Sequence, residues 1–162
     1  STLHTNSAPE TITRLLDMGL NPLNFSDAFL GVLAQRLVRR LCSKCKEPYS
    51  PPPEELEFIE RELEGAKGIK PSKDVTLFRP RMTEEGLGCS YCSHTGYRGR
   101  TAIHELMKGT KELKRLIRKE APTEELFLQA QRDGMLTLRQ DGLLKVLNGI
   151  TDLSELRRVV VT

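Results

Sequence analysis

The chain has 162 residues, of which 38% are hydrophobic and 5% are aromatic, and it carries a formal net charge of +3. This composition favours a helix-rich α+β protein with a leucine-packed core, or two small cores. The charge does not by itself indicate a nucleic-acid-binding protein. No apolar run reaches the roughly 18 residues of a membrane span, and no signal peptide opens the chain. Because the first residue is Ser1 and not methionine, we expect a piece of a longer protein.

Two helices are predicted near the N-terminus. Ser7 and Glu10 form a capping box, which predicts a helix over residues 8–18 that ends at Gly19. A second helix is predicted over residues 22–34, because apolar residues recur there at helical spacing. These residues are Phe25, Phe29, Leu30 and Leu33.

A pair of strands is predicted to enclose the middle of the chain. Residues 35–41 suit either a helix or a strand. We favour a strand, because residues 100–107 follow a Gly-Tyr-Arg-Gly turn and have the short, mixed polarity of a partner strand. Between them, residues 54–64 predict a short acidic helix, whereas residues 65–88 are rich in Gly, Pro and charge and predict mostly loop.

The last third of the chain predicts helices only. Thr110 and Thr123 are the expected caps of two helices, and Thr137 with Gln140 forms a capping box for a third. A fourth helix is expected to start at Thr151.

Two Cys-x-x-Cys pairs, Cys42 with Cys45 and Cys89 with Cys92, give the strongest local signal. Together they supply four thiolates, the full ligand set of a closed tetrahedral zinc site. A metal would close the loop of 43 residues between the pairs, so we expect a structural zinc at the end of an antiparallel strand pair. Two disulfides or buried free thiols are the alternatives, but the spacing favours zinc and a reducing cytoplasm.

Basic residues lie close to these cysteines in the sequence. A zinc ion with four thiolates carries a charge of −2, which Lys44 and Lys46 are placed to stabilise. Five arginines are candidates for phosphate or subunit contacts, although a solvated basic face is the favoured interpretation: Arg36, Arg39, Arg40, Arg98 and Arg100. His94 is expected to be a solvated loop residue and not a metal ligand, and His104 is expected to be a packing or surface residue.

Four segments of the chain carry a resemblance to a known family. Residues 1–6 (Ser-Thr-Leu-His-Thr-Asn) look like a His box, and residues 33–42 resemble a segment that enters a tetracysteine module. Residues 89–100 look like the exit from that module, and residues 135–151 resemble a C-terminal helical region. In this order the segments are similar to the hexameric ATPases that power type II secretion and type IV pilus assembly.

The resemblance implies a division into three parts. Residues 1–41 would be the C-terminal part of a RecA-like nucleotide-binding domain, residues 42–98 a tetracysteine zinc module, and residues 99–162 a returning strand with a small all-helical C-terminal subdomain. The parent would be a homo-hexamer that binds ATP and magnesium and lies in the cytoplasm, peripheral to the bacterial inner membrane. Its partners would be an inner-membrane platform protein and other secretion or pilus machinery components.

The chain lacks the phosphate-binding loop G-x-x-x-x-G-K-[ST] of that family. The resemblance gives His4, in the His box, a catalytic place near the terminal phosphate of ATP in the intact parent, although a lone histidine near a terminus is more often structural. We therefore expect the isolated chain not to hydrolyse ATP.

Two other functions are compatible with paired cysteines. A zinc-ribbon nucleic-acid-binding module is favoured by the basic residues near Cys42, but interleaved aromatic residues are missing and the acidic segment 54–64 opposes phosphate. A dithiol oxidoreductase needs a βαβ context and an exposed thiol of low pKa, which the sequence does not indicate. We expect no nucleic-acid partner.

Overall fold

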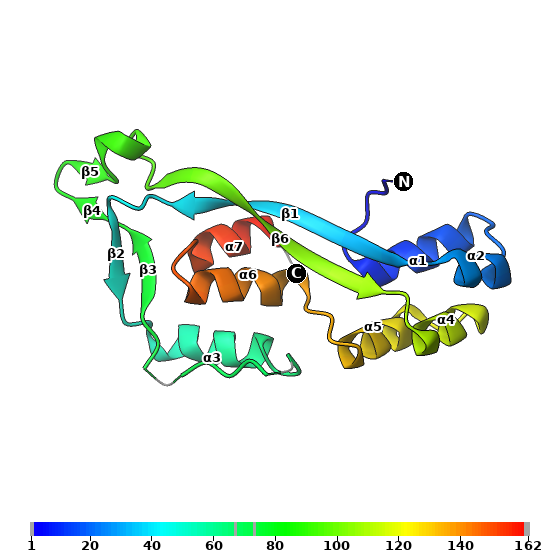
Figure 1. Cartoon of the computed structure of the whole chain (residues 1–162). Helices are drawn as coiled ribbons and strands as arrows, with labels where there is room; N and C mark the ends of the chain where they lie inside the picture. Colours follow the sequence, from blue (N-terminus) through cyan, green and yellow to red (C-terminus); the bar gives the residue numbers. More distant parts are fainter. Residues whose placement is uncertain (1, 67, 73, 161–162) are drawn as a thin grey trace. The chain divides into compact units, whose positions relative to one another are not determined.

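The chain folds into two compact units, and the computed structural model describes residues 2–66, 68–72 and 74–160. Unit 1 comprises the described residues of Ser1–Gln35, Gly65–Lys67 and His104–Leu138, and unit 2 comprises those of Arg36–Glu64, Gly68–Ile103 and Arg139–Thr162. Helices occur together with small antiparallel sheets, which confirms the α+β, helix-rich prediction (Figure 1). No helix among the described residues has the length and apolarity needed to cross a membrane.

Unit 1 is a group of short helices around one apolar core. It contains α1 (Ala8–Asp17), α2 (Pro22–Ala28), α4 (Lys111–Arg118) and α5 (Thr123–Arg132). The predicted caps Ser7 and Thr110 are confirmed, because their hydroxyl groups accept hydrogen bonds from backbone N–H groups in the first turns of α1 and α4. Helix α1 packs on α5, and α4 packs on α2 and α5. The buried core residues are Ala8, Ile12, Phe29, Met107, Leu113, Ile117, Leu126, Ala130 and Met135.

The predicted helix over residues 22–34 is wrong in its second half. Helix α2 already ends at Ala28, and strand β1 (Gly31–Leu41) follows. The Leu30 carbonyl accepts a hydrogen bond of 2.9 Å from the Gly109 N–H. Pairing with a segment far away in the sequence therefore outweighs the local helical spacing of the apolar residues.

Strand β1 pairs with β6 (Tyr97–Lys108) to form a two-stranded ribbon (Figure 1). The strands are antiparallel, because Gly31 lies against Met107 whereas Gly99 lies beside Arg40. Both strands predicted from the sequence are confirmed, and each is longer than predicted.

Glu105, on β6, is a buried acid whose side chain accepts hydrogen bonds at the N-termini of two helices. The residue is 3% exposed, and its carboxylate accepts hydrogen bonds from the N–H groups of Ala8 at 2.6 Å and Leu138 at 3.1 Å. These are the first residues of α1 and of α6 (Leu138–Leu147). One side chain therefore satisfies two helix N-termini that would otherwise be buried without acceptors.

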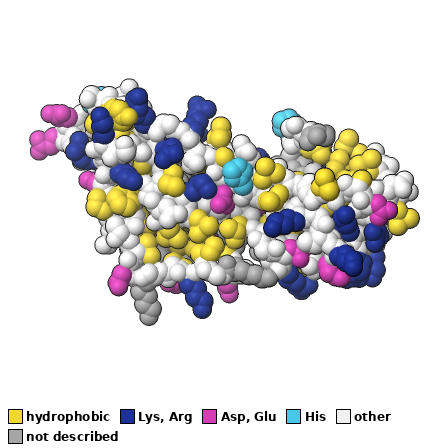
Figure 2. All heavy atoms as spheres, viewed as in Figure 1, with side chains coloured by type: hydrophobic (Ala, Val, Ile, Leu, Met, Phe, Trp, Pro, Cys, Tyr) yellow, Lys and Arg dark blue, Asp and Glu magenta, His cyan; other side chains and the backbone are white. Residues whose placement is uncertain are grey.

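Unit 2 contains short strands that the sequence analysis missed. Strand β2 (Lys46–Tyr49) pairs antiparallel with β3 (Leu77–Pro80), and β4 (Met82–Thr83) pairs with β5 (Gly86–Leu87). The segment predicted as mostly loop thus holds three of these strands. Lys and Arg side chains gather on the visible face of unit 2 around β4 and β5 (Figure 2).

Unit 2 also contains α3 (Pro53–Glu62), α7 (Leu153–Val159) and the rest of α6. Helix α3 confirms the predicted acidic helix. The cap of α7 is Asp152 and not Thr151, because Asp152 accepts from the N–H at position 155 at 2.9 Å whereas the Thr151 hydroxyl donates to the Arg39 carbonyl. Thr123 is likewise not a cap, since it is the first residue of α5 and Pro122 holds the cap position.

Candidate metal centre

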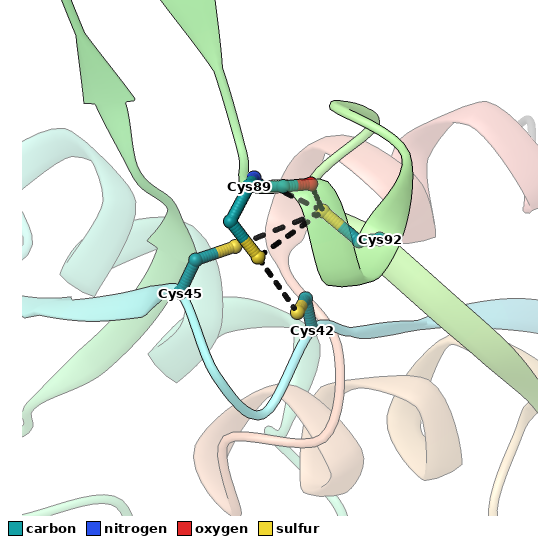
Figure 3. A group of neighbouring side chains, drawn as sticks. All are labelled: Cys42, Cys45, Cys89 and Cys92. Carbon is teal, nitrogen blue, oxygen red and sulfur yellow. Dashed lines mark hydrogen bonds between the residues drawn. The ribbon is translucent and has the colours of Figure 1, made fainter.

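The four cysteines lie in two turns at ends of regular elements. Cys42 follows β1 and Cys45 precedes β2, and their turn is closed by a hydrogen bond of 3.0 Å from the Lys46 N–H to the Cys42 carbonyl. Cys89 precedes a short 3₁₀ turn (Ser90–Cys92) and Cys92 is its last residue, and this turn precedes β6. The ribbon of β1 and β6 therefore places the two pairs together, and all four side chains point toward one another (Figure 3).

The sulfur atoms have the spacing of a tetrahedral site. All four lie within 4.8 Å of one another, with Sγ–Sγ distances of 3.8 Å for Cys42 to Cys89, 3.8 Å for Cys45 to Cys92 and 4.0 Å for Cys89 to Cys92. Zinc–sulfur bonds of about 2.3 Å give a regular tetrahedron an edge of about 3.8 Å. A disulfide needs about 2.05 Å, and all four cysteines are free thiols. The donor set fits one zinc ion.

Backbone N–H groups lower the pKa of two of the four cysteines, which favours the thiolate form that binds a cation. Hydrogen bonds from the N–H groups of Cys89 (3.3 Å) and Gly96 (3.2 Å) lower the pKa of Cys92 from 9.0 to about 6. A backbone hydrogen bond from Cys92 lowers the pKa of Cys89 in the same way. Burial has the opposite effect on Cys45 and raises its pKa to about 12. A metal ion supplies the charge that a buried thiol needs to lose its proton.

Gly88 allows the backbone to approach the sulfur atoms closely. Its φ of +71° is in the left-handed region, and an added Cβ would lie 2.8 Å from the Cys92 Sγ and 2.8 Å from the Gly96 nitrogen. A side chain at position 88 would therefore clash with the cluster.

The cations near the cysteines in the sequence contact an aromatic ring and backbone carbonyls, and their stabilisation of the thiolates stays a prediction. The Tyr91 ring lies 4.0 Å from the Lys44 ammonium and 4.2 Å from the Arg98 guanidinium, and Arg98 also donates a 2.7 Å hydrogen bond to the Tyr91 carbonyl. Among the described residues the candidate ligand group comprises the four cysteines, and His94 is an exposed residue outside it.

Arg39 has a contact that sequence reasoning missed. Its backbone N–H donates to Glu155 at 3.1 Å, and its guanidinium forms an ion pair of 2.8 Å with the same carboxylate, which is fully buried. Arg39 is therefore not simply part of a solvated basic face. Nothing in the local sequence indicated the pair, because its partner is 116 positions away.

His4 belongs to unit 1. It is exposed and lines an open pocket of about 310 Å³ together with Asn6, Glu10, Thr13 and Arg14. His104 is an exposed residue of β6.

Comparison with known proteins identifies relatives along the whole chain. Residues 1–158 match the family described as Type II/IV secretion system protein. The type IV pilus assembly ATPase PilB of Thermus thermophilus is 45% identical over 158 residues, which cover 96% of this chain and 16% of that protein. The type II secretion system protein E of Pseudomonas aeruginosa is 44% identical, and the type II secretion system ATPase E of Vibrio cholerae is 46% identical, each over 159 residues. The chain spans 29% of the length of each of these two relatives.

Proposed function

The chain belongs to the type II/IV secretion system protein family, and from this premise we propose that it is the C-terminal portion of an ATPase that couples ATP hydrolysis to protein export or to pilus or pseudopilus assembly. The observation that carries the proposal is the match over residues 1–158, together with 44–46% identity to relatives named as secretion or pilus assembly proteins. Because the chain spans at most 29% of the length of those three relatives, the activity belongs to the longer protein.

In this proposal, three consecutive segments of the chain have different roles. Residues 1–41 complete a RecA-like nucleotide-binding domain, residues 42–98 form a zinc module, and residues 99–162 form the returning strand and a helical subdomain. In the longer protein, which we propose to be a homo-hexamer on the cytoplasmic side of the bacterial inner membrane, ATP and magnesium occupy the nucleotide site. The partner is an inner-membrane platform protein within the secretion or pilus machinery.

We propose that Cys42, Cys45, Cys89 and Cys92 hold one structural zinc ion. The Sγ–Sγ distances and the N–H groups aimed at Cys92 support this assignment. Zinc closes the long loop between the two pairs, and four thiolates leave no open position for a substrate. The surrounding side chains contribute shape and charge at this centre and take no part in a reaction.

We propose that His4 acts near the terminal phosphate of ATP in the longer protein. Its exposed position in an open pocket leaves the imidazole accessible to a nucleotide. A positioned donor near the transferred phosphate group stabilises charge that develops in the transition state.

A chimera tests the proposal. This chain replaces the matching 159-residue segment of the Vibrio cholerae relative, and ATP hydrolysis and secretion are measured in a strain that lacks the native protein. We expect both activities to be retained at a substantial level. A matched chimera with Cys42→Ser and Cys89→Ser should lose activity together with its zinc. A folded, zinc-loaded chimera without ATPase activity would contradict the assignment.

A further inference from the structure

A second feature of unit 2 is a polar pocket beside the cysteine cluster. The pocket has a volume of about 320 Å³, and its walls come from the end of β1, both cysteine turns, the start of β6 and the turn that follows α6. The side chains that matter for a ligand are Arg40, Ser43, Lys46, Tyr91, Arg98 and Asn148. No carboxylate is among the described residues that line it.

Two of the three cations in the pocket wall are held in place by the fold. The Lys46 ammonium donates to the Gly149 carbonyl at 2.9 Å and lies 4.7 Å from the centre of the Phe78 ring. It thereby pairs with a carbonyl of the turn that follows α6, whose negative dipole end would otherwise repel an anion. Arg98 is fixed by its hydrogen bond to the Tyr91 carbonyl and by the Tyr91 ring. Fixed donors lose little conformational entropy when a ligand binds.

Arg40 completes the set as the cation available to a ligand. It is exposed, and among the residues that the structure describes its guanidinium forms no salt bridge. The neighbouring Arg39 differs, because Glu155 neutralises it. An unpaired guanidinium on a pocket wall presents its planar donors to an oxyanion.

The cations near the pocket carry more positive charge than the zinc–cysteine cluster carries negative charge. A zinc ion with four thiolates has a charge of −2. Lys44, beside the Tyr91 ring, and the three cations of the pocket wall together carry +4. The net positive charge of these groups favours an anion in the pocket, and Figure 2 shows Lys and Arg side chains, together with Asp and Glu side chains, at this end of unit 2.

We propose that this pocket binds a phosphate group of an anionic ligand, with Arg40 and Arg98 as its charged donors and Ser43 and Asn148 as neutral ones. A volume of about 320 Å³ accommodates a small phosphorylated compound or a single lipid headgroup. The recognition chemistry is the same for both sources. The site lies outside the four-cysteine group and differs from the nucleotide site proposed for the longer protein.

Calorimetry with inorganic pyrophosphate tests the site on the full 162-residue chain loaded with zinc. Arg40→Gln should weaken pyrophosphate binding about tenfold, because it removes a charge-assisted contact. Arg100→Gln is the matched control, since it removes the same charge from the same end of the ribbon without removing a lining residue. It should change the affinity less than about twofold. Zinc content and circular dichroism establish that each variant is folded.

Sedimentation with phosphatidylglycerol vesicles separates the two sources. The ligand is a lipid headgroup if the wild-type chain sediments with these vesicles and pyrophosphate displaces it. In that case the Arg40→Gln variant should not sediment. Pyrophosphate binding without sedimentation assigns it to a free phosphorylated compound. The proposal is overturned if the wild type does not bind pyrophosphate, or if Arg40→Gln and Arg100→Gln weaken binding equally.

Discussion

At the residue scale, Glu155 is a buried acid of unit 2 that pairs with two arginines. Its carboxylate is fully buried and lies 2.8 Å from Arg39 and 2.6 Å from Arg158. Burial alone would raise the pKa of this acid, but the hydrogen bonds from Arg158 and Arg39 outweigh burial and hold the pKa at about 2 instead of 4.5. A depressed pKa in the folded state means that the stabilisation is present above the unfolded pKa and is lost as the pH falls toward 2.

Glu155→Gln should therefore lower the free energy of unfolding by about 3 kcal/mol at pH 7. The difference between wild type and variant should shrink as the pH falls from about 4.5 to about 2, because the wild-type carboxylate is then protonated as well. Urea unfolding at a series of pH values measures this. Glu112→Gln removes an exposed ion pair with Arg115 and serves as the control, with an expected effect of at most about 0.5 kcal/mol. A pH-independent difference would contradict the role of the Glu155 charge.

Glu105 gives a second prediction at this scale. Glu105→Ala removes the acceptor for the N–H groups of Ala8 and Leu138, and two buried donors without partners should cost about 2–4 kcal/mol of stability. Hydrogen exchange should accelerate first in the opening turns of α1 and α6. Glu105→Gln keeps one acceptor oxygen and should show a smaller loss. Equal protection of those turns in wild type and Glu105→Ala would refute the double cap.

At the element scale, features that depend on neighbouring residues were predictable and features that depend on distant partners were not. The caps Ser7 and Thr110 and the two cysteine turns follow from local spacing, so sequence reasoning located them. The end of α2 was missed because the Leu30 carbonyl pairs with Gly109. Strand β3 was missed because helix α3 and the segment after it separate it in the sequence from its partner β2. The cap at Asp152 was missed by one residue, because Thr151 also has a capping side chain.

The cysteine turns provide a prediction for these elements. Cys42→Ser, or removal of zinc with a chelator, should accelerate hydrogen exchange in β2, in the Cys89–Cys92 turn and at the start of β6 by about tenfold or more. Helices α1, α2, α4 and α5 should stay protected, because their core contains none of the four cysteines. Exchange measured by mass spectrometry resolves the two sets of peptides. Ser43→Ala, within the same turn, leaves the thiolates intact and should keep its zinc. Loss of protection in all helices together would show that the two units unfold as one.

At the scale of the whole molecule, the proposed division between nucleotide chemistry and scaffold predicts that the isolated chain does not hydrolyse ATP above the rate in buffer. Phosphoryl transfer depends on a loop that cradles phosphate, on magnesium ligands and on positioned charge, and His4 alone does not supply them. In the full-length protein, His4→Ala should lower turnover about tenfold or more while nucleotide affinity changes little, as expected for a group that acts in the transition state. His104→Ala, a second exposed histidine, is the matched control and should leave turnover unchanged. Equal turnover in wild type and His4→Ala would remove His4 from the reaction. Sustained ATPase activity of the purified 162-residue chain, abolished by a substitution within it, would show that the catalytic groups lie inside this segment.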